Sequence, residues 1–264
     1  MARTPRVLSI AGSDSGGGAG IQADLKAFAA AGVHGMTAIT AITAQNTVGV
    51  TAVHPVPPDV IVAQVKAVAD DIGVDAVKIG MLGDQPTIEA VARALDLIPG
   101  APVVIDPVMV SESGARLLDE HAVGELRDLL IRRATVVTPN VPEALVLVGG
   151  GYRQEPAHLA EEIHLLGPKA VVVTGGHRAE AIDTFYDGEQ LVEIPGPRHA
   201  DGAAHGSGCT HSSTLAAYLA RGATPLEAAR KAKEAASEAV RNGLRDIGQG
   251  PGPVNVLGPG TGLS

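Results

Sequence analysis

Two glycine-rich segments of the chain have the composition of loops that bind phosphate groups. In the first, residues 10–26, four glycines and two serines surround Asp14 before a helix that we expect to begin near Gly20. Because glycine has no side chain, the backbone N–H groups of such a loop can approach a ligand closely. The spacing matches neither the Walker P-loop nor the dinucleotide fingerprint, and a tight turn between a strand and a helix is the alternative interpretation.

The second segment, residues 204–213, has the sequence AHGSGCTHSS and leads directly into a stretch with helical periodicity. The amides of Gly206, Ser207, Gly208 and Cys209 would then lie at the N-terminus of a helix, where N–H groups and the helix dipole attract an anion. We therefore predict an anion hole here. The first helical turn also lowers the pKa of a thiol below about 8.5, which would activate Cys209. Packing of Cys209 as a small apolar side chain is the alternative.

Two carboxylates follow apolar, strand-like runs. Asp106 ends the run PVVID, and Glu143 lies in TPNVPEA, after the run that ends at residue 138. Mg²⁺ usually takes one or two carboxylates together with substrate phosphates and water, so the two side chains could hold this ion. Asn140 and Glu143 are also spaced as a helix-capping box, with Pro142 in the first turn. The two roles are compatible.

A primary amide, Gln45, follows the strand-like run MTAITAITA. A carboxamide offers an acceptor beside a donor, which complements the edge of an aminopyrimidine. The alternative is a glutamine on the surface without a ligand. The nine histidines show no H-E-x-x-H spacing, so zinc catalysis is unsupported and we assign them no catalytic role.

The elements that position these residues follow from the alternation of the sequence. Short β-branched runs alternate with longer Ala-rich segments of helical period, a pattern typical of βαβ units with buried parallel strands. Ligands of such open sheets bind at the carboxyl ends of the strands, where the motifs above would meet. We predict strands at residues 6–10, 36–43, 76–79, 103–106, 135–138 and 170–174, a hairpin at 181–186 and 190–194, and helices at 20–31, 58–70, 86–97, 121–132, 142–148, 156–166, 210–221 and 225–244.

The composition predicts a single compact domain over residues 1–264. Apolar residues make up 45% of the chain, and the formal charge of −9 with only two Phe, three Tyr and no Trp argues against a nucleic-acid partner. No run of about 18 apolar residues predicts a membrane span. The single cysteine excludes a disulfide framework and fits a cytoplasmic protein. Residues 248–264 are so rich in Gly and Pro that we expect no regular element there and a disordered end.

Several of these motifs together resemble the hydroxymethylpyrimidine phosphate kinases of thiamine biosynthesis. The resemblance covers residues 7–256 and rests on IAGSDSGGGAGIQADLK, TAQNT, IGML, DPVM, TPNVPEA and HGSGCT in this order. It implies a three-layer ribokinase-like α/β fold, with a mostly parallel central sheet and helices on both faces, and a homodimer. It also implies Mg²⁺ and ATP as cofactors for phosphorylating 4-amino-5-hydroxymethyl-2-methylpyrimidine and then its monophosphate to the diphosphate.

For the acceptor, the resemblance implies that Gln45 contacts the pyrimidine edge and that Asp24 faces the hydroxymethyl end. The residues that it places around the ring are Ala19, Met81 and Val108. The segment after DPVMV, residues 111–117, is polar and contains a glycine. We predict that it closes over the site as a flap.

For phosphoryl transfer, the resemblance implies that Asp106 and Glu143 serve Mg²⁺. Asn140, Thr174 and Lys233 would lie near the nucleotide. It places an anion hole at the transferring phosphoryl group, formed by Gly206, Gly208 and the candidate base Cys209. Several relatives have a lysine where this chain has Thr174, so part of the charge neutralisation must come from another residue.

Two other functions remain as alternatives. Some pyridoxal or pyridoxine kinases of vitamin B6 salvage are similar to this family, but they tend to have an apolar residue where this chain has Gln45. A non-catalytic pyrimidine sensor is supported only by Thr174. The combination of Asp106, Glu143 and Cys209 argues against the sensor, which would not need all three.

Overall fold

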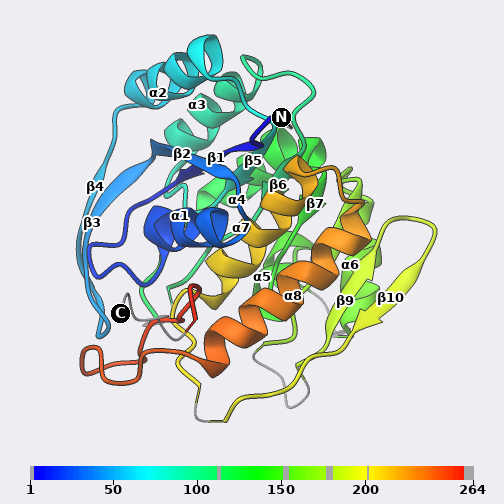
Figure 1. Ribbon diagram of the computed structural model, residues 1–264. Coiled ribbons are helices and arrows are strands. Elements are labelled where there is room, and N and C mark those ends of the chain that lie inside the picture. Colours follow the sequence, from blue (N-terminus) through cyan, green and yellow to red (C-terminus); the bar gives the residue numbers. More distant parts are fainter. Residues whose placement is uncertain (1–2, 112–113, 151–154, 177–180, 201, 259–264) are drawn as a thin grey trace.

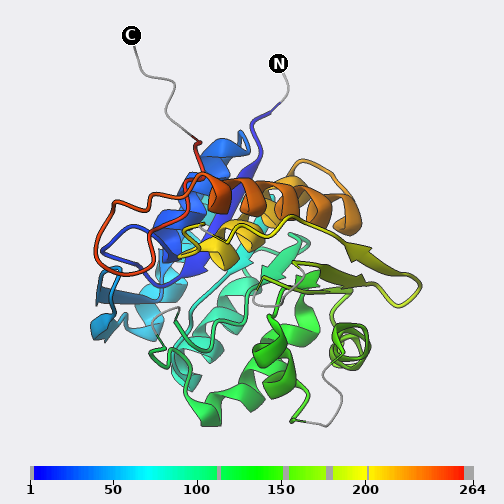
Figure 2. The ribbon, with the colours of Figure 1, turned by 90° about the horizontal axis from the view of Figure 1, so that it is seen from below.

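An eight-stranded sheet forms the centre of the molecule, and helices cover both of its faces (Figures 1 and 2). The computed structural model describes residues 3–111, 114–150, 155–176, 181–200 and 202–258. Six neighbouring strands are parallel, in the order β8 (Ala170–Val173), β7 (Val136–Val137), β6 (Val103–Ile105), β5 (Ala76–Ile79), β1 (Arg6–Ala11) and β2 (His34–Ile39). The predicted hairpin, β9 (Asp183–Tyr186) and β10 (Leu191–Ile194), extends the β8 edge in antiparallel orientation. The predicted three-layer fold with a mostly parallel sheet is confirmed.

Each face of the sheet carries its own apolar cluster, because the strands are apolar on both sides. The helices α1 (Gly20–Ala30), α7 (Ser207–Ala220) and α8 (Pro225–Arg241) cover one face, and their cluster includes Phe28, Phe185 and Leu215. The helices on the opposite face are α2 (Pro58–Asp71), α3 (Gln85–Leu95), α5 (Val141–Leu147) and α6 (Pro156–His164). Proline lies at the first or second position of α2, α3, α5, α6 and α8, where its missing N–H is not needed.

The predicted helix 121–132 is present as an irregular succession of short turns. It comprises η1 (Glu120–Ala122), α4 (Val123–Glu125), η2 (Leu126–Leu130) and η3 (Ile131–Arg133), in which η2 is a π-turn. Ala122 is buried, and so are the larger side chains of Leu126, Leu130 and Ile131. The wider π-turn places these three residues on one face. The hydrophobic spacing therefore requires a departure from the regular helix that we predicted.

The predicted single strand 36–43 is wrong, because the chain turns at Thr40. After β2 it leaves the main sheet, and β3 (Ala41–Gln45) pairs with β4 (Val50–Pro55) in a separate antiparallel sheet. Thr40 is buried, its Oγ1 donates to Met81 O at 2.7 Å, and its N donates to Ala11 O at 3.0 Å. These bonds fix the turn, which the continuous run of β-formers does not reveal.

The C-terminal segment contains no helix or strand over residues 248–258, as predicted. Its buried residues Gly252, Pro253 and Val254 nevertheless pack against the rest of the chain. The predicted disordered end, residues 259–264, lies outside the described residues. Within the described part of the chain, every helix is too short or too polar to cross a bilayer.

Candidate active site

The loops at the carboxyl ends of the parallel strands and the start of α7 enclose a cavity of about 500 Å³. This is the edge where open α/β sheets bind their ligands. All the predicted site residues except Asp24 contribute to the wall of this cavity: Ala19, Gln45, Met81, Asp106, Val108, Asn140, Glu143, Thr174, Gly206, Gly208, Cys209 and Lys233. The structure therefore brings together motifs from both ends of the chain.

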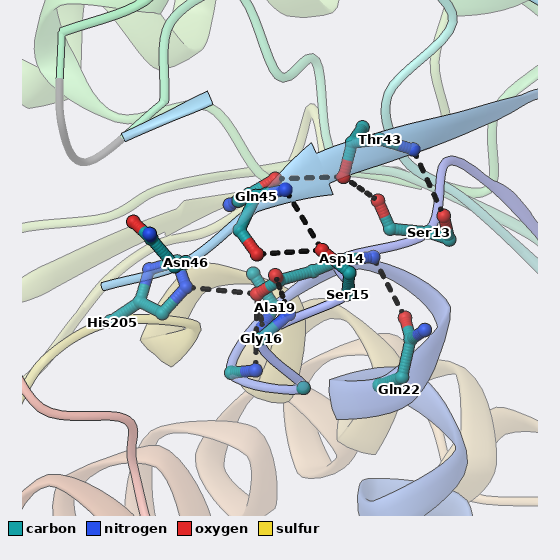
Figure 3. A network of polar contacts seen from close by, with 12 residues as sticks. Ser13, Asp14, Ser15, Gly16, Ala19, Gln22, Thr43, Gln45, Asn46 and His205 are labelled. Atoms are coloured by element: carbon teal, nitrogen blue, oxygen red, sulfur yellow. Dashed lines mark hydrogen bonds and ion pairs between the residues drawn. The ribbon is translucent and has the colours of Figure 1, made fainter. Parts of the chain in front are cut away.

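Asp14 organises the first glycine-rich loop (Figure 3). Its buried carboxylate accepts hydrogen bonds from the amides of Gly16, Gly18 and Ala19 at 2.8–3.0 Å, and it lies 3.0 Å from His205 Nε2. Burial favours the neutral acid, but the hydrogen bonds from His205 and the amides outweigh it and hold the pKa of Asp14 below its usual value. Asp14 thereby ties the loop before α1 to the loop before α7.

The two glycine-rich loops touch through their backbones. Gly206 has a φ of +87°, and a β-carbon on it would lie only 1.8 Å from the carbonyl oxygen of Gly18. A β-carbon on Gly18 would in turn lie 2.3 Å from a ring carbon of His205. Only glycine fits at either position. His205, to which we assigned no catalytic role, thus has a structural one, because it holds the two loops together.

All four residues expected to form the anion hole, Gly206, Ser207, Gly208 and Cys209, line the cavity. The amide of Ser207 donates instead to Ala204 O at 2.9 Å, which removes it from the predicted set. The first main-chain bond into α7 is from Thr210 N to Gly206 O at 2.9 Å. The amides of Gly208 and Cys209 come before this bond, at the helix end that attracts an anion.

The predicted low pKa of Cys209 is wrong. Burial raises the pKa of this thiol to about 12, and the carboxylates of Asp24 and Asp106 add to the effect, while the Lys78 ammonium opposes it. The amide of Gly20 donates a hydrogen bond toward the sulfur. A position in the first turn of a helix is therefore insufficient here, because loss of water outweighs the dipole.

The two predicted metal ligands lie near each other in the cavity wall. Burial and then the charge of Asp106 raise the pKa of Glu143 to about 8, although the amides of Asn140 and Met109 oppose this. Burial also raises the pKa of Asp106, against the attraction of Lys78 and a hydrogen bond from Ser212. A cation between the two carboxylates would offset their mutual repulsion when both are ionised. A divalent ion that also binds phosphate oxygens fits this donor set.

The alternative role of Asn140 and Glu143 is also present. Asn140 Oδ1 accepts from Glu143 N, and Glu143 Oε2 accepts from Asn140 N, both at 2.9 Å, which is a capping box at the start of α5. Among the described residues, no group of three or more His, Cys, Asp or Glu side chains could hold a metal ion.

Asp24 does not face the cavity, contrary to the prediction. It is fully buried behind Lys78, whose Nζ lies 2.8 Å from Asp24 Oδ1. The hydroxyls of Ser9 and Ser213 also donate to the Asp24 carboxylate, at 2.6 and 2.7 Å. Lys78 lines the cavity in its place. Burial alone would lower the pKa of Lys78, but the Asp24 charge raises it above its usual value, so the cavity floor carries a fixed positive charge.

A second buried ionic cluster lies in the cavity wall. Lys233 Nζ lies 2.6 Å from Asp183 Oδ1, and His211 Nε2 lies 3.2 Å from Asp183 Oδ2. Burial opposes ionisation of Asp183, but His211 and Lys233 hold its pKa below the usual value. Lys233 reaches the cavity as predicted. We did not predict Asp183, Lys78 or His211. Of these three residues only Lys78 had a signal in the sequence, because it is a single lysine within the otherwise apolar strand AVKI.

The backbone of Gln45 is fixed by the first glycine-rich loop. Ser15 Oγ donates to Gln45 O at 2.6 Å and accepts from Gln45 N at 2.8 Å, and Thr43 Oγ1 lies 3.4 Å from Gln45 Oε1 (Figure 3). The side chain of Gln45 contributes to the cavity wall. Position 45 is thus set by the loop that also contacts His205.

Two other predictions lie only partly within the structure. Ser111 and Leu117 of the predicted flap line the cavity, whereas Glu112 and Ser113 lie outside the described residues. Thr174 lines the cavity, and its amide donates to Pro139 O at 2.9 Å. His177, the last residue of TGGH, also lies outside the described residues.

Known proteins resemble this chain over nearly its whole length. A family model described as phosphomethylpyrimidine kinase matches residues 14–255. The hydroxymethylpyrimidine/phosphomethylpyrimidine kinase of Rhizobium meliloti (strain 1021) is 50% identical over 258 residues, which cover 96% of this chain and 97% of that protein. The ADP complex of Bacillus subtilis pyridoxal kinase has a TM-score of 0.88 at 39% identity, covering 97% of this chain and 98% of its own. The phosphomethylpyrimidine kinase of Clostridium difficile 630 has a TM-score of 0.79 at 41% identity, and the match covers 90% of this chain and 100% of that chain.

Proposed function

The chain belongs to the phosphomethylpyrimidine kinase family, and on this premise we propose that it phosphorylates 4-amino-5-hydroxymethyl-2-methylpyrimidine with ATP. It then phosphorylates the monophosphate to the diphosphate in the same cavity, as a step of thiamine biosynthesis. One observation carries the proposal: a single cavity combines the Gln45 carboxamide with a carboxylate pair and a helix N-terminus. A carboxamide complements an aminopyrimidine edge. Phosphoryl transfer depends on positioning and charge neutralisation.

The direct test is incubation of the purified chain with MgATP and, separately, hydroxymethylpyrimidine, its monophosphate and pyridoxal. ADP release and product mass are followed together. Formation of the pyrimidine diphosphate from both pyrimidines is the expected result. Pyridoxal 5′-phosphate as the only product would move the chain to vitamin B6 salvage, and absence of turnover with all three compounds would support a non-catalytic sensor.

In the proposed reaction, the acceptor hydroxyl oxygen forms a bond to the γ-phosphorus of ATP, and the bond from that phosphorus to the bridging oxygen breaks. Gln45 orients the pyrimidine ring, and Ala19, Met81 and Val108 surround it. The amides of Gly206, Gly208 and Cys209 bind the transferring phosphoryl group at the start of α7, where a helix end stabilises negative charge.

Charge neutralisation comes from several places on the cavity wall. Lys78 supplies a fixed positive charge at the floor, and Lys233, paired with Asp183, lies at the nucleotide side. Asn140 and Thr174 complete the nucleotide side. Asp106 and Glu143 would hold Mg²⁺, which neutralises phosphate charge when it is bound. Thr174 therefore need not be a lysine.

Cys209 acts in this proposal as a neutral group that contacts the acceptor hydroxyl. With its pKa raised to about 12 by burial, the thiol keeps its proton at pH 7 and cannot serve as the general base in that state. The hydroxyl proton passes instead to an oxygen of the transferred phosphoryl group. A loose transition state requires little activation of the attacking hydroxyl.

Replacement of Gln45 by methionine is expected to weaken use of the pyrimidine far more than use of pyridoxal. An unpaired ring edge loses roughly 1–3 kcal/mol, which corresponds to a roughly 5- to 150-fold fall in kcat/KM for hydroxymethylpyrimidine. Steady-state kinetics on both acceptors measure the difference. Equal losses on the two acceptors would contradict the assignment of Gln45 to the ring edge.

The apparent affinity for Mg²⁺ is expected to rise with pH. Below pH 8 the Glu143 carboxyl is largely protonated, since its pKa is raised to about 8, and Mg²⁺ binds the ionised form. One proton lost per ion predicts about a tenfold gain between pH 7 and pH 9. The MgCl₂ concentration that gives half-maximal ADP release, determined at several pH values, measures this apparent affinity. Glu143→Gln, which can still cap α5, should flatten the dependence, and an unchanged slope in this variant would refute the assignment.

Phosphorylation of pyridoxal is a second candidate activity. The similarity to Bacillus subtilis pyridoxal kinase favours it, since that structure covers almost the whole chain at 39% identity. We propose it as a side activity because Gln45 suits an aminopyrimidine better than a pyridine. The acceptor comparison described above distinguishes the main from the side activity.

We propose a homodimer in which a second copy covers the β3–β4 sheet. This sheet projects from the main sheet (Figure 1) and exposes the apolar side chains of Ile42, Val48 and Val53. Light scattering after gel filtration should give twice the 26.7 kDa of the chain. Val53→Glu should yield monomers, while glutamate at the 84% exposed Leu165 should not. A monomeric wild-type chain would contradict the proposal.

The organisation and location of the protein follow from the same proposal. Residues 1–264 are treated as one domain because both apolar clusters pack on opposite faces of a single sheet. ATP is a cytoplasmic metabolite, so the proposed reaction places the enzyme in the cytoplasm.

A further inference from the structure

The C-terminal strap, residues 248–255, contacts two of the loops that form the acceptor side of the cavity (Figures 1 and 2). Sequence composition predicts only an irregular tail here. In the structure, however, the strap passes from the β3–β4 turn to the loop before α7. Its middle residues, Gly252, Pro253 and Val254, are buried. Such burial in a segment without helix or strand requires specific contacts, which the strap makes at Gln249 and Gly250 and again over residues 252–255.

The first end of the strap is hydrogen-bonded to the turn that follows Gln45. The amides of Gln249 and Gly250 both donate to Thr47 Oγ1 at 3.2 Å. The fit is close, since a β-carbon on Gly250 would lie 1.8 Å from Thr47 O. Thr47 is two residues from Gln45 in a closed turn, in which Asn46 N donates to Gly49 O at 3.0 Å. Movement of the turn would therefore carry Gln45 with it.

The second end of the strap pairs with the loop that carries the anion hole. His205 N donates to Gly252 O at 3.3 Å, and Val254 N donates to His205 O at 3.0 Å. This pairing holds the backbone of His205, whose ring lies 3.0 Å from Asp14. The next residue, Asn255, donates its amide to Ala239 O of α8 at 2.9 Å. The strap is thus anchored to a rigid helix beyond the loop.

We propose that the strap positions Gln45 relative to the loop that carries the anion hole, residues 204–209. The pyrimidine ring bound by Gln45 then places its hydroxymethyl group at the transferring phosphoryl group. The β3–β4 sheet is separate from the main sheet, so this relation depends on the strap together with the hydrogen bonds between Ser15 and Gln45. Thr47 is in this role a positioning residue. The inference rests on the proposed function, because it concerns the pyrimidine acceptor of that reaction.

The test compares Thr47→Val with Thr47→Ser, because valine removes the acceptor for the two strap amides and serine keeps it. Loss of two hydrogen bonds predicts about a five- to tenfold rise in the KM for hydroxymethylpyrimidine in Thr47→Val. The KM for ATP and the Tm should stay near the wild-type values. Thr47→Ser should restore the pyrimidine KM, and Leu257→Ala, at a side chain that is 66% exposed, should leave all three values unchanged.

A wild-type pyrimidine KM in Thr47→Val would overturn the inference. An equal rise of both KM values together with a lower Tm would also overturn it, because it would show a purely structural role. A second comparison removes residues 248–264 or only residues 259–264. The longer deletion should raise the pyrimidine KM, and the shorter one, which removes none of the contacts named here, should not. An inactive wild-type chain would instead refute the proposed function, so the two failures are distinguishable.

Discussion

Lys78→Met is expected to lower the free energy of unfolding by about 3–5 kcal/mol, since it removes one partner of a buried ion pair. Lys78 and Asp24 are both 0% exposed, and their charged groups lie 2.8 Å apart. Methionine has a similar length but no charge, so Asp24 would be left with only the hydroxyls of Ser9 and Ser213. Because Lys78 also lines the cavity, kcat should fall on the order of 10²- to 10³-fold as well.

Urea unfolding measures the loss of stability, with an unchanged m-value showing that the folded state stays comparable. The matched control is Arg133→Met. Arg133 pairs with Asp96 at a similar distance, 2.7 Å, but the two side chains are 37% and 68% exposed, so the expected loss is below about 1 kcal/mol. Asp24→Asn combined with Lys78→Met should recover stability without recovering activity. Equal losses in the single and double variants would show that the unpaired charge is not the cause.

Gly206→Ala is expected to impair both folding and turnover, because position 206 has no room for a side chain. Alanine at a φ of +87° carries about 1–2 kcal/mol of strain, and its β-carbon would meet Gly18 O at 1.8 Å. The two glycine-rich loops would have to separate. We expect a total destabilisation of about 3 kcal/mol or more, with kcat reduced at least about 100-fold by the displaced amides.

Gly208→Ala is the matched control, with the same substitution two residues further along, in the first turn of α7. The nearest atom to a β-carbon at this position is Asp106 Oδ2 at 3.8 Å, and alanine favours a helix over glycine by about 1 kcal/mol. Its Tm should therefore equal or exceed that of the wild type. Thermal unfolding of both variants decides the point: similar Tm values would contradict the proposed contact between the loops.

Elements with local signals were predicted correctly from the sequence. Prolines at helix starts and continuous apolar runs located most helices and strands within a few residues. All the site residues implied by the family resemblance except Asp24 line the cavity. The split of 36–43 into β2 and β3 had no local signal, because the turn depends on bonds from Thr40 to Met81 and Ala11, and Met81 is distant in the sequence.

Predictions failed where a residue's properties depend on a distant partner. The contact between Asp24 and Lys78 joins residues 54 positions apart, and that between Asp14 and His205 joins residues 191 positions apart. Neither spacing leaves a periodic pattern in a single sequence. The pKa of Cys209 failed for a related reason: the sequence places the thiol at a helix start but does not show how much water the fold removes from it.

The contact between the two glycine-rich loops also determines when the cavity can be completed during synthesis of the chain. The ribosome makes the loop around Asp14 before every strand except β1, whereas His205 and the strap that holds it are made after all the strands. Domains generally fold as units, and the contact between the two loops can form only once residues 205–255 have been made. A nascent chain that stops before His205 would thus lack the contact that joins the two loops.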